Sequence, residues 1–295
     1  MIWLLLFIVV IYFVLDLLYR RTNHYKNLFE DTLKLREYKN IPIDYINIGS
    51  TQARYAYDFG NIGLNVATNE QSLEYSFMLL KKYVKNLKKG GNVIITIADM
   101  DLLLTGGLQQ RKYKYCGILP VKVKDLFKYK FFPLLFNIKA IKYILKDEKL
   151  YNKFDVSQNL LLNDSQRYND CQRRIKRWES YGAFYSNDEK KFELKNNNLE
   201  YNIKILNNII EFCLLHNYNV VVITPPTSKY FNDFFGDSFK EVLNKPIEDF
   251  AYNNVKYFDY SSDESINNDE NFLNTACLNQ AGRTKFTDIV IKSLQ

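Results

Sequence analysis

Histidine is scarce in this sequence of 295 residues, with only His24 and His216 present. Cysteine is also infrequent, and its four positions are scattered, without a CxxC pair or a cluster with histidine: Cys116, Cys171, Cys213 and Cys277. Protein zinc sites are built from closely spaced cysteines and histidines, so no metal site is predicted. Gly106-Gly107 does not follow the strand-to-helix pattern of a phosphate-binding loop. The sequence therefore predicts no cofactor.

The composition excludes a wholly disordered chain, because apolar residues make up 47% of it. The length fits one large domain with an insertion, or two small domains. The formal net charge is +7. This charge permits contact with anionic lipids or acidic polymers, although a solvated lysine-rich surface explains it equally well.

The N-terminus begins with a long apolar run. Residues 2–15 are uninterrupted apolar sequence, and Asp16 is followed by three more hydrophobic or aromatic residues. This reaches the roughly 18 residues that can cross a bilayer. A cleaved signal peptide would need a basic start and a small-residue cleavage site, and neither is present. Trp3, Tyr12 and Tyr19 suit a membrane interface better than a buried core helix.

We therefore expect residues 2–19 to form a single transmembrane helix, within an anchor that comprises residues 1–20. A charged connector, residues 21–41, follows. Arg20, Arg21 and Lys26 stand directly after the apolar run. By the positive-inside tendency, this charge would place the rest of the chain in the cytoplasm.

The remainder, residues 42–295, alternates between short β-branched runs and amphipathic segments. Such alternation predicts an α/β domain with a doubly wound parallel sheet. The expected strands are 43–48, 61–67, 92–99, 219–226 and 255–261. The expected helices are 70–89, closed by Gly90-Gly91, then 199–217, and a last one from about Gly282.

About 100 residues, roughly 100–198, break this alternation, and we expect them to form a helical insertion. Within it, residues 122–146 are rich in lysine and aromatic residues. After Pro133, apolar residues share one helical face and lysines another. This stretch fits binding to lipid headgroups, an anionic polysaccharide or nucleic acid, or simply a cap helix with a solvated face. We expect no nucleic-acid partner.

Functional groups in parallel α/β sheets gather at the carboxyl ends of the strands. Five segments at these ends resemble, in order, the SGNH (GDSL-like) hydrolase superfamily, and most closely its membrane-anchored bacterial branch. That branch includes lipoteichoic-acid D-alanylation proteins and polysaccharide O-acyl esterases and transferases. The resemblance covers about residues 42–100 and 199–295. The segments are "INIGSTQARY", "LNVATNEQSLEYSFMLLKKY", "VIITIAD", "VVVITPPTSKYF" and "FLNTACLNQAGRTKFT".

The resemblance assigns roles to positions of this chain. The family presents its nucleophile in a Gly-x-Ser turn, which here reads Gly49-Ser50-Thr51, so Thr51 takes the nucleophile's place. The oxyanion glycine corresponds to Asn69-Glu70, and the oxyanion asparagine to the segment Asp99-Met100-Asp101. The last block, Asp-x-x-His-x-x-x-x-Gly, corresponds to Asn274, Cys277 and Gly282.

These substitutions remove the ordinary triad. A serine or threonine nucleophile needs a nearby base that is oriented by an acceptor. Asn274 carries no negative charge to stabilise an imidazolium, and Cys277 is not an imidazole. Glu70 or Asp99 beside an oxyanion would repel the charge that develops in the transition state. None of the nucleophile, base, acid and oxyanion positions keeps the residue type that its role requires.

Other readings of the same residues stay open. Cys277 could be a nucleophile if a cation lowered its pKa, or a small buried side chain in the space of a lost histidine. Ser50 could take the nucleophile's role through a one-residue shift, or simply bond to neighbouring backbone. Asp99 and Asp101 could form a carboxylate pair for acid chemistry or metal, or serve as turn and cap residues.

The resemblance implies a membrane-anchored, catalytically degenerate protein of bacterial cell-surface polysaccharide or teichoic-acid modification. Its partners would be the membrane and an anionic glycan or a membrane O-acyltransferase, and its globular domain would be extracytoplasmic. An active O-acyl esterase or acyltransferase with a non-standard nucleophile is the alternative. A structural membrane-assembly protein is a third reading.

Overall fold

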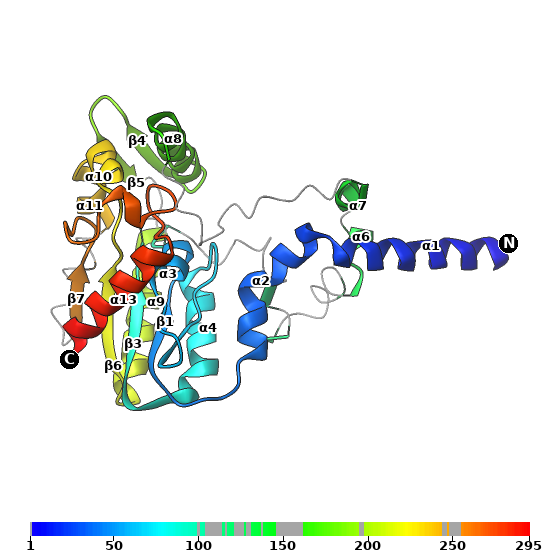
Figure 1. Cartoon of the computed structure of the whole chain (residues 1–295), viewed down its shortest axis with the longest axis horizontal. Helices are drawn as coiled ribbons and strands as arrows, with labels where there is room; N and C mark the ends of the chain where they lie inside the picture. The colour runs from blue at the N-terminus through cyan, green and yellow to red at the C-terminus, as the bar shows by residue number, and fades with distance from the viewer. Residues whose placement is uncertain are drawn as a thin grey trace. The chain divides into compact units, whose positions relative to one another are not determined.

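The computed structural model contains a five-stranded parallel sheet (Figure 1). Its spatial order is β2-β1-β3-β6-β7, which is the doubly wound order 2-1-3-4-5 of the strands taken in sequence. The expected parallel α/β sheet is therefore confirmed. The strands are β1 Ile43–Ile48, β2 Gly63–Asn65, β3 Leu87–Thr96, β6 Asn219–Thr224 and β7 Lys256–Asp259.

The structure describes residues 2–98, 101–103, 114–115, 117–120, 127, 131–136, 138–145, 162–194, 198–243, 247 and 255–295. The chain divides into two units. The smaller one combines Met1–Lys39 with Gln109–Asp155, and the larger one combines Asn40–Leu108 with Val156–Gln295. The sheet belongs to the larger unit.

The middle of the sheet is buried on both faces. Ile94 of β3 pairs with Asn47 of β1 and Val221 of β6, and these buried side chains share one face. The flanking residues of β3, Val93 and Ile95, point to the opposite face and are fully buried as well. β-branched residues suit such a strand because they pack well on a pleated surface. Burial on both faces in turn requires a layer of helices on each.

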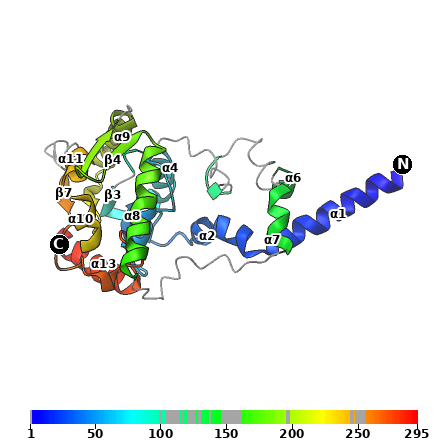
Figure 2. The same ribbon diagram turned by 90° about the horizontal axis from the view of Figure 1, so that it is seen from above.

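Four helices supply these layers: α3 Thr51–Ala56, α4 Leu73–Tyr83, α9 Asn198–Leu215 and α13 Gln280–Leu294. α4 packs against α9, and α3 packs against α13. Figure 2 shows α4 and α9 on one face of the sheet and α13 on the other. Apolar residues of α13 join one core cluster with Ile94 and Val221, so this helix closes its face of the sheet.

One element boundary differs from the sequence prediction. The helix expected over 70–89 ends at Tyr83, and a 3₁₀ turn, η1 Val84–Asn86, leads directly into β3. Gly90-Gly91 therefore lies inside β3 rather than at a helix end. Gly90 has φ +73°, and the pairing register of β3 with β1 shifts between Ile43 and Tyr45. The glycines accommodate this irregularity in the ladder.

The insertion is helical only in part. It contains α8 Asp164–Glu179, followed by an antiparallel hairpin of β4 Ala183–Ser186 and β5 Lys191–Leu194. Trp178, at the end of α8, is fully buried and packs edge to face against Tyr185 and Phe192 of this hairpin. The hairpin strands are too short to show a clear alternation in the sequence, so the pattern did not predict them.

The smaller unit contains α1 Ile2–Arg21, α2 Asn23–Glu37, α6 Pro133–Phe136, the 3₁₀ helix η4 Ile138–Ile141 and α7 Lys142–Leu145. The helix expected after Pro133 is thus built from short pieces, which pack against α1. Among the helices as the structure describes them, none combines the length and the hydropathy that crossing a bilayer requires.

Candidate functional site

The turn after β1 places Ser50 and Thr51 at the carboxyl end of the sheet. Gly49 has φ +147°, and a Cβ atom added to it would lie 2.5 Å from both the Thr96 carbonyl oxygen and the Ala53 Cβ. Only glycine fits here. The chain therefore turns sharply, and α3 begins at Thr51. Ser50 is the N-cap residue of α3, is buried, and accepts the Thr51 N–H with its Oγ at 2.5 Å.

A network of hydrogen bonds between buried polar groups holds this turn in place. Asn47 of β1 donates from Nδ2 to the Ala53 carbonyl oxygen at 3.2 Å and to Asn65 Oδ1 at 2.9 Å. Its own Oδ1 accepts the Thr96 hydroxyl at 2.7 Å. The start of α3 is therefore tied to β1, β2 and β3 together. The sequence analysis did not single out these residues, since a polar residue inside a strand gives no pattern of its own.

Thr51 and Glu70 meet at this edge of the sheet. The Glu70 backbone N–H donates to Thr51 Oγ1 at 3.0 Å, and Glu70 has the left-handed φ of +53°. Asn69 precedes it and is half-buried. The Glu70 carboxylate forms an ion pair with Arg177 of α8. The positions that the resemblance gave to the nucleophile and the oxyanion glycine are thus in direct contact.

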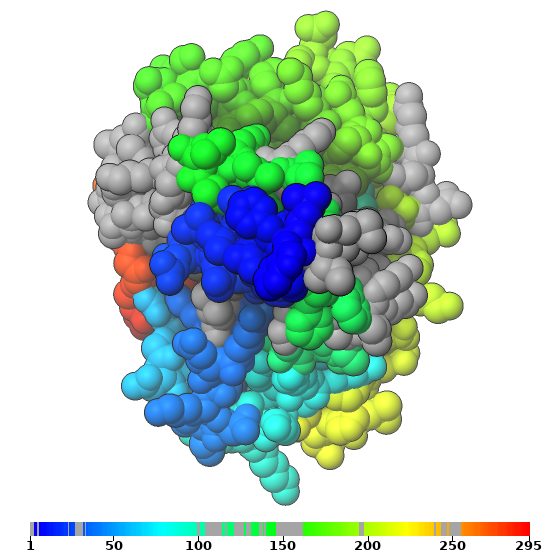
Figure 3. All heavy atoms as spheres, turned by 90° about the vertical axis from the view of Figure 1, so that its right-hand side faces the viewer, coloured from blue at the N-terminus to red at the C-terminus, as the bar shows by residue number. Residues whose placement is uncertain are grey.

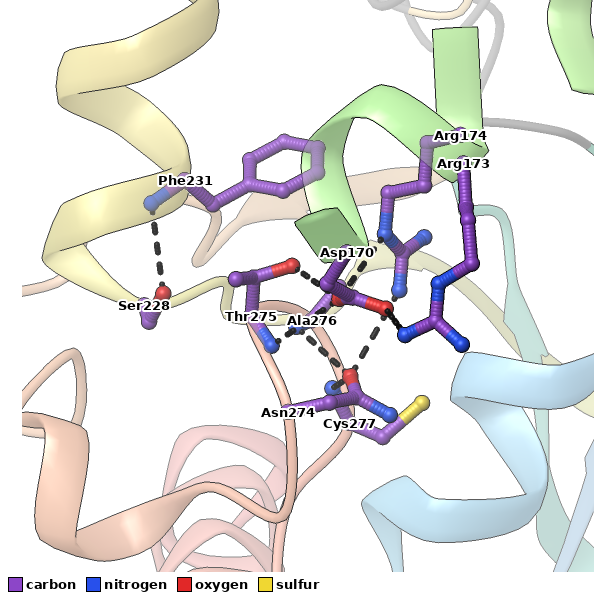
Figure 4. Close-up of polar contacts among 9 residues, drawn as sticks. All are labelled: Asp170, Arg173, Arg174, Ser228, Phe231, Asn274, Thr275, Ala276 and Cys277. Carbon is purple, nitrogen blue, oxygen red and sulfur yellow. Dashed lines mark hydrogen bonds and ion pairs between the residues drawn. The ribbon is translucent and has the colours of Figure 1, made fainter. Parts of the chain in front are cut away.

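The loop before α13 holds Asn274 and Cys277 (Figure 4). Asn274 Oδ1 accepts the backbone N–H groups of Ala276 and Cys277, each at 3.0 Å, so its amide stabilises its own turn. Cys277 is 2% exposed and packs with Tyr55 of α3 and Leu273. The predicted nucleophile and base positions are therefore joined through α3, which carries both Thr51 and Tyr55.

Asp170 of α8 connects the insertion to this loop, and the sequence analysis missed it. Its Oδ2 accepts the Thr275 hydroxyl at 2.6 Å and the Thr275 N–H at 3.3 Å, and its Oδ1 pairs with Arg173 at 2.9 Å. Burial raises the pKa of Asp170, but the charge of Arg174 and the hydrogen bond from Thr275 outweigh it. The pKa of this carboxyl therefore lies below its ordinary value, and Asp170 is ionised at neutral pH.

Arg174 extends the same contact (Figure 4). Its Nε lies 3.6 Å from Asp170 Oδ2, and its Nη2 donates to Asn274 Oδ1 at 3.5 Å. With Arg177 on Glu70, α8 brings two guanidinium groups to residues at the strand ends. A possible signal in the sequence was the run of basic residues after the aspartate, "NDCQRRIKR", whose spacing puts Asp170, Arg174 and Arg177 near one helix face.

The remaining acidic candidates do not combine into a described site. Asp101 is 1% exposed, and its Oδ2 accepts the Ala98 N–H at 2.9 Å, as a turn residue does. Asp99 lies outside the described residues. Among the residues that the structure covers, no group of three or more histidine, cysteine, aspartate or glutamate side chains could hold a metal ion.

Neither histidine is placed as a base in the α/β unit. His216 follows the C-terminal end of α9 and precedes β6, at the amino end of that strand, where its Nδ1 lies 2.8 Å from the Phe212 carbonyl oxygen. His24 belongs to the smaller unit, where it stacks on Tyr143 with ring centroids 3.8 Å apart.

Two hollows lie along α8. A cavity of only about 10 Å³ touches Asn274 and Thr275, which is close to the room that one water molecule needs. A hollow of about 520 Å³ lies on the outer side of the helix, within the usual range of small-ligand sites. It is lined by Leu162, Gln166, Asn169, Gln172, Arg173 and Lys176.

Comparisons with known proteins add no relative. No model of a protein family matches this chain, and no curated protein matches it. The SGNH resemblance therefore stays a prediction from the sequence motifs.

Proposed function

We propose that this protein is a membrane-anchored, non-hydrolytic member of the SGNH-like proteins that binds an anionic cell-surface glycan and supports a membrane O-acyltransferase. The observation that carries the proposal is the place of the catalytic base. That position holds Cys277, buried against Tyr55 and Leu273. The residue that would orient the base, Asn274, uses its side-chain oxygen to hold its own loop.

Loss of hydrolysis follows from the chemistry of these groups. General base catalysis needs a group of suitable pKa within hydrogen-bond reach of the nucleophile. A buried thiol is a poor base, and a neutral amide does not stabilise an imidazolium. The Glu70 N–H is directed at Thr51 Oγ1 rather than at a vacant oxyanion position. In this arrangement the scaffold of the site is kept and its proton chemistry is removed.

Glycan binding is supported by the outer hollow of α8. Gln166, Asn169 and Gln172 offer amide groups, which donate to and accept from sugar hydroxyls. Arg173 and Lys176 add two positive charges, and both are exposed. Amide groups beside cations fit a polyhydroxylated ligand that carries phosphate or carboxylate groups.

Membrane anchoring is supported by α1. The helix has 20 residues, and its residues 2–15 are apolar without interruption in the sequence. Its large apolar side chains are exposed on all sides along its first half, as in Trp3, Phe7 and Ile11. We place the larger unit outside the cytoplasm on the resemblance, against the charge of Arg20 and Arg21, which favours the opposite orientation.

An active O-acyl esterase or acyltransferase with a non-standard nucleophile is the second candidate. The observation in its favour is again the hydrogen bond from the Glu70 N–H to Thr51 Oγ1. A donor at this oxygen would stabilise a threonine alkoxide, so Thr51 is the residue that this candidate requires.

The binding proposal is tested by titrating the detergent-solubilised full-length protein with purified teichoic acid and with neutral dextran. We expect binding of the teichoic acid alone, weakened by salt because the contacts are charged. Lys176→Glu should weaken it strongly, whereas Lys285→Glu, an exposed lysine of α13, should not. Equal effects of the two variants, or equal binding of dextran, would contradict a site on α8.

A further inference from the structure

The smaller unit carries a second apolar surface besides α1. Among the described residues of 127–145 in the insertion, five large apolar side chains are exposed: Phe127, Phe131, Leu135, Ile138 and Leu145. Leu145 is 81% exposed and Ile138 is 69% exposed. Single exposed apolar residues are ordinary on protein surfaces, but a group of this size marks a site of interaction. These residues are called the apolar face of the insertion below.

The opposite side of this segment packs against α1. Leu134 and Ala140 are buried in one cluster with Tyr19, against which Tyr12 and Leu15 also pack. Tyr12, Leu15 and Tyr19 are spaced at three and four residues, so they form one stripe along α1. Figure 3 looks along α1 from its N-terminal end and shows green atoms of this segment around the blue atoms of the helix, and Figure 1 shows α6 and α7 beside the end of α1 that leads into α2. The apolar face of the insertion is therefore continuous with the exposed apolar surface of α1.

This packing also covers the one charge in the apolar run. Asp16 lies on the same stripe, is 5% exposed, and pairs with Arg20 at 2.6 Å. Arg20 in turn donates to the Phe131 carbonyl oxygen at 3.1 Å and to the Tyr25 hydroxyl at 3.1 Å. An ionisable residue in an apolar segment is costly in a bilayer unless it is paired and faces protein. Asp16 is paired with Arg20 of the same helix and is buried, and Arg20 in turn is held by the insertion through the Phe131 carbonyl oxygen.

Exposed basic groups accompany the apolar side chains of the smaller unit. Lys142 and Arg21 are exposed in the same unit, and Lys142 Nζ lies 4.8 Å from the ring centroid of Tyr143. Tyr143 stacks on His24 of α2, so α7 is fixed at the junction of α1 and α2. Apolar side chains beside exposed cations and tyrosines are the composition of a segment that lies in a membrane interface.

We infer that residues 127, 131–136 and 138–145 belong to a second membrane-contacting element, which lies in the interface of a bilayer with anionic lipids and seats its apolar face at the boundary of the acyl chains. The inference rests on the proposed anchoring by α1. It assigns the insertion two tasks: shielding the Asp16–Arg20 pair from lipid, and fixing the depth at which α1 enters the membrane.

The test uses tryptophan fluorescence of the full-length protein in vesicles of phosphatidylcholine and phosphatidylglycerol, with or without bromine on the acyl chains. The variant Leu145→Trp is made in a Trp3→Phe background, which leaves only the fully buried Trp178 as a constant emitter. The matched control is Leu215→Trp in the same background, because Leu215 is 80% exposed but belongs to the larger unit. Unchanged protein, with Trp3 present, reports on α1.

We expect brominated lipid to quench the tryptophan at 145 and at 3, and to leave the one at 215 unchanged. Quenching at 3 without quenching at 145 would overturn the inference and leave the anchor in place. Quenching at 145 without quenching at 3 would contradict anchoring by α1 while supporting the interfacial segment. Equal emission at 145 and 215 with both lipids, together with a blue shift at 145 as protein concentration rises, would overturn the inference in favour of contact between two copies.

Discussion

The backbone N–H of Glu70 donates a hydrogen bond to the side-chain oxygen of Thr51 at 3.0 Å. The two residues stand 19 positions apart, after neighbouring strands, at places where the sequence resemblance put an oxyanion glycine and a nucleophile. Glu70 also has a left-handed backbone at φ +53°, which glycine adopts without strain. The backbone thus adopts a conformation that suits glycine, although the residue at this position is a glutamate.

The strain at Glu70 can be measured through stability. Glu70→Ala and Glu70→Gly both remove the ion pair with Arg177, but only glycine relieves the left-handed φ. We expect the glycine variant to be more stable than the alanine variant by about 1 kcal/mol. Urea denaturation followed by circular dichroism measures the difference. Arg177→Ala is the control for the ion pair alone, and equal stability of the two Glu70 variants would contradict the strain.

Asp170 should be the most important polar residue in the docking of α8. Its carboxylate accepts two hydrogen bonds from Thr275 and contacts Arg173 and Arg174 while largely buried. Asp170→Ala should lower the free energy of unfolding by about 2–4 kcal/mol, because it leaves these donors unpaired. Asp164→Ala, in the exposed first turn of the same helix, should have little effect. Similar losses in both variants would show that Asp170 has no special role.

The same carboxylate predicts a dependence on pH. Its folded pKa lies below the ordinary value of 3.8, so the folded state holds the charged form more favourably than the unfolded state does. This stabilisation is complete above the unfolded pKa and is lost as pH falls through the folded pKa. The stability difference between unchanged protein and Asp170→Asn should therefore be constant near neutral pH and shrink below about pH 4. A stability difference that grows as the pH falls would contradict this prediction.

Gly282 should tolerate no larger residue. It lies in the first turn of α13, where a Cβ atom would lie 2.2 Å from the Asn271 carbonyl oxygen. Gly282→Ala should therefore cost about 1–3 kcal/mol, since the loop that carries Asn274 must move. Lys285→Ala, on an exposed position of the same helix, is the control in thermal unfolding. Equal thermal stability of Gly282→Ala and the unchanged protein would mean that the loop moves without an energetic cost, which would contradict the prediction.

Much of the sheet could be predicted from the sequence, because Val93–Ile95 and Val221–Ile223 form β-branched runs that suit buried parallel strands. The contact between Thr51 and Glu70 was not predictable in detail, although both were expected at one edge. Neither Asp170 nor the α8 hollow was predicted from the sequence. A polar helix in an insertion has no periodic apolar pattern, so its sequence does not show which part of the protein it packs against. The position of α8 depends on the tertiary packing of its Trp178 against the hairpin.

The proposal that this protein does not hydrolyse esters is tested by measuring the turnover of a small acetyl ester by the full-length protein. Positioned acid–base catalysis contributes roughly a hundred- to ten-thousandfold, so its absence is measurable. We predict no more turnover than Thr51→Ala shows. The combined variant Thr51→Ser, Asn274→Asp, Cys277→His introduces the three residue types of the ordinary triad. Hydrolysis gained by this variant would show that the scaffold still supports the chemistry. Robust hydrolysis by the unchanged protein that Thr51→Ala, Ser50→Ala or Cys277→Ala abolishes would contradict the account and identify the nucleophile.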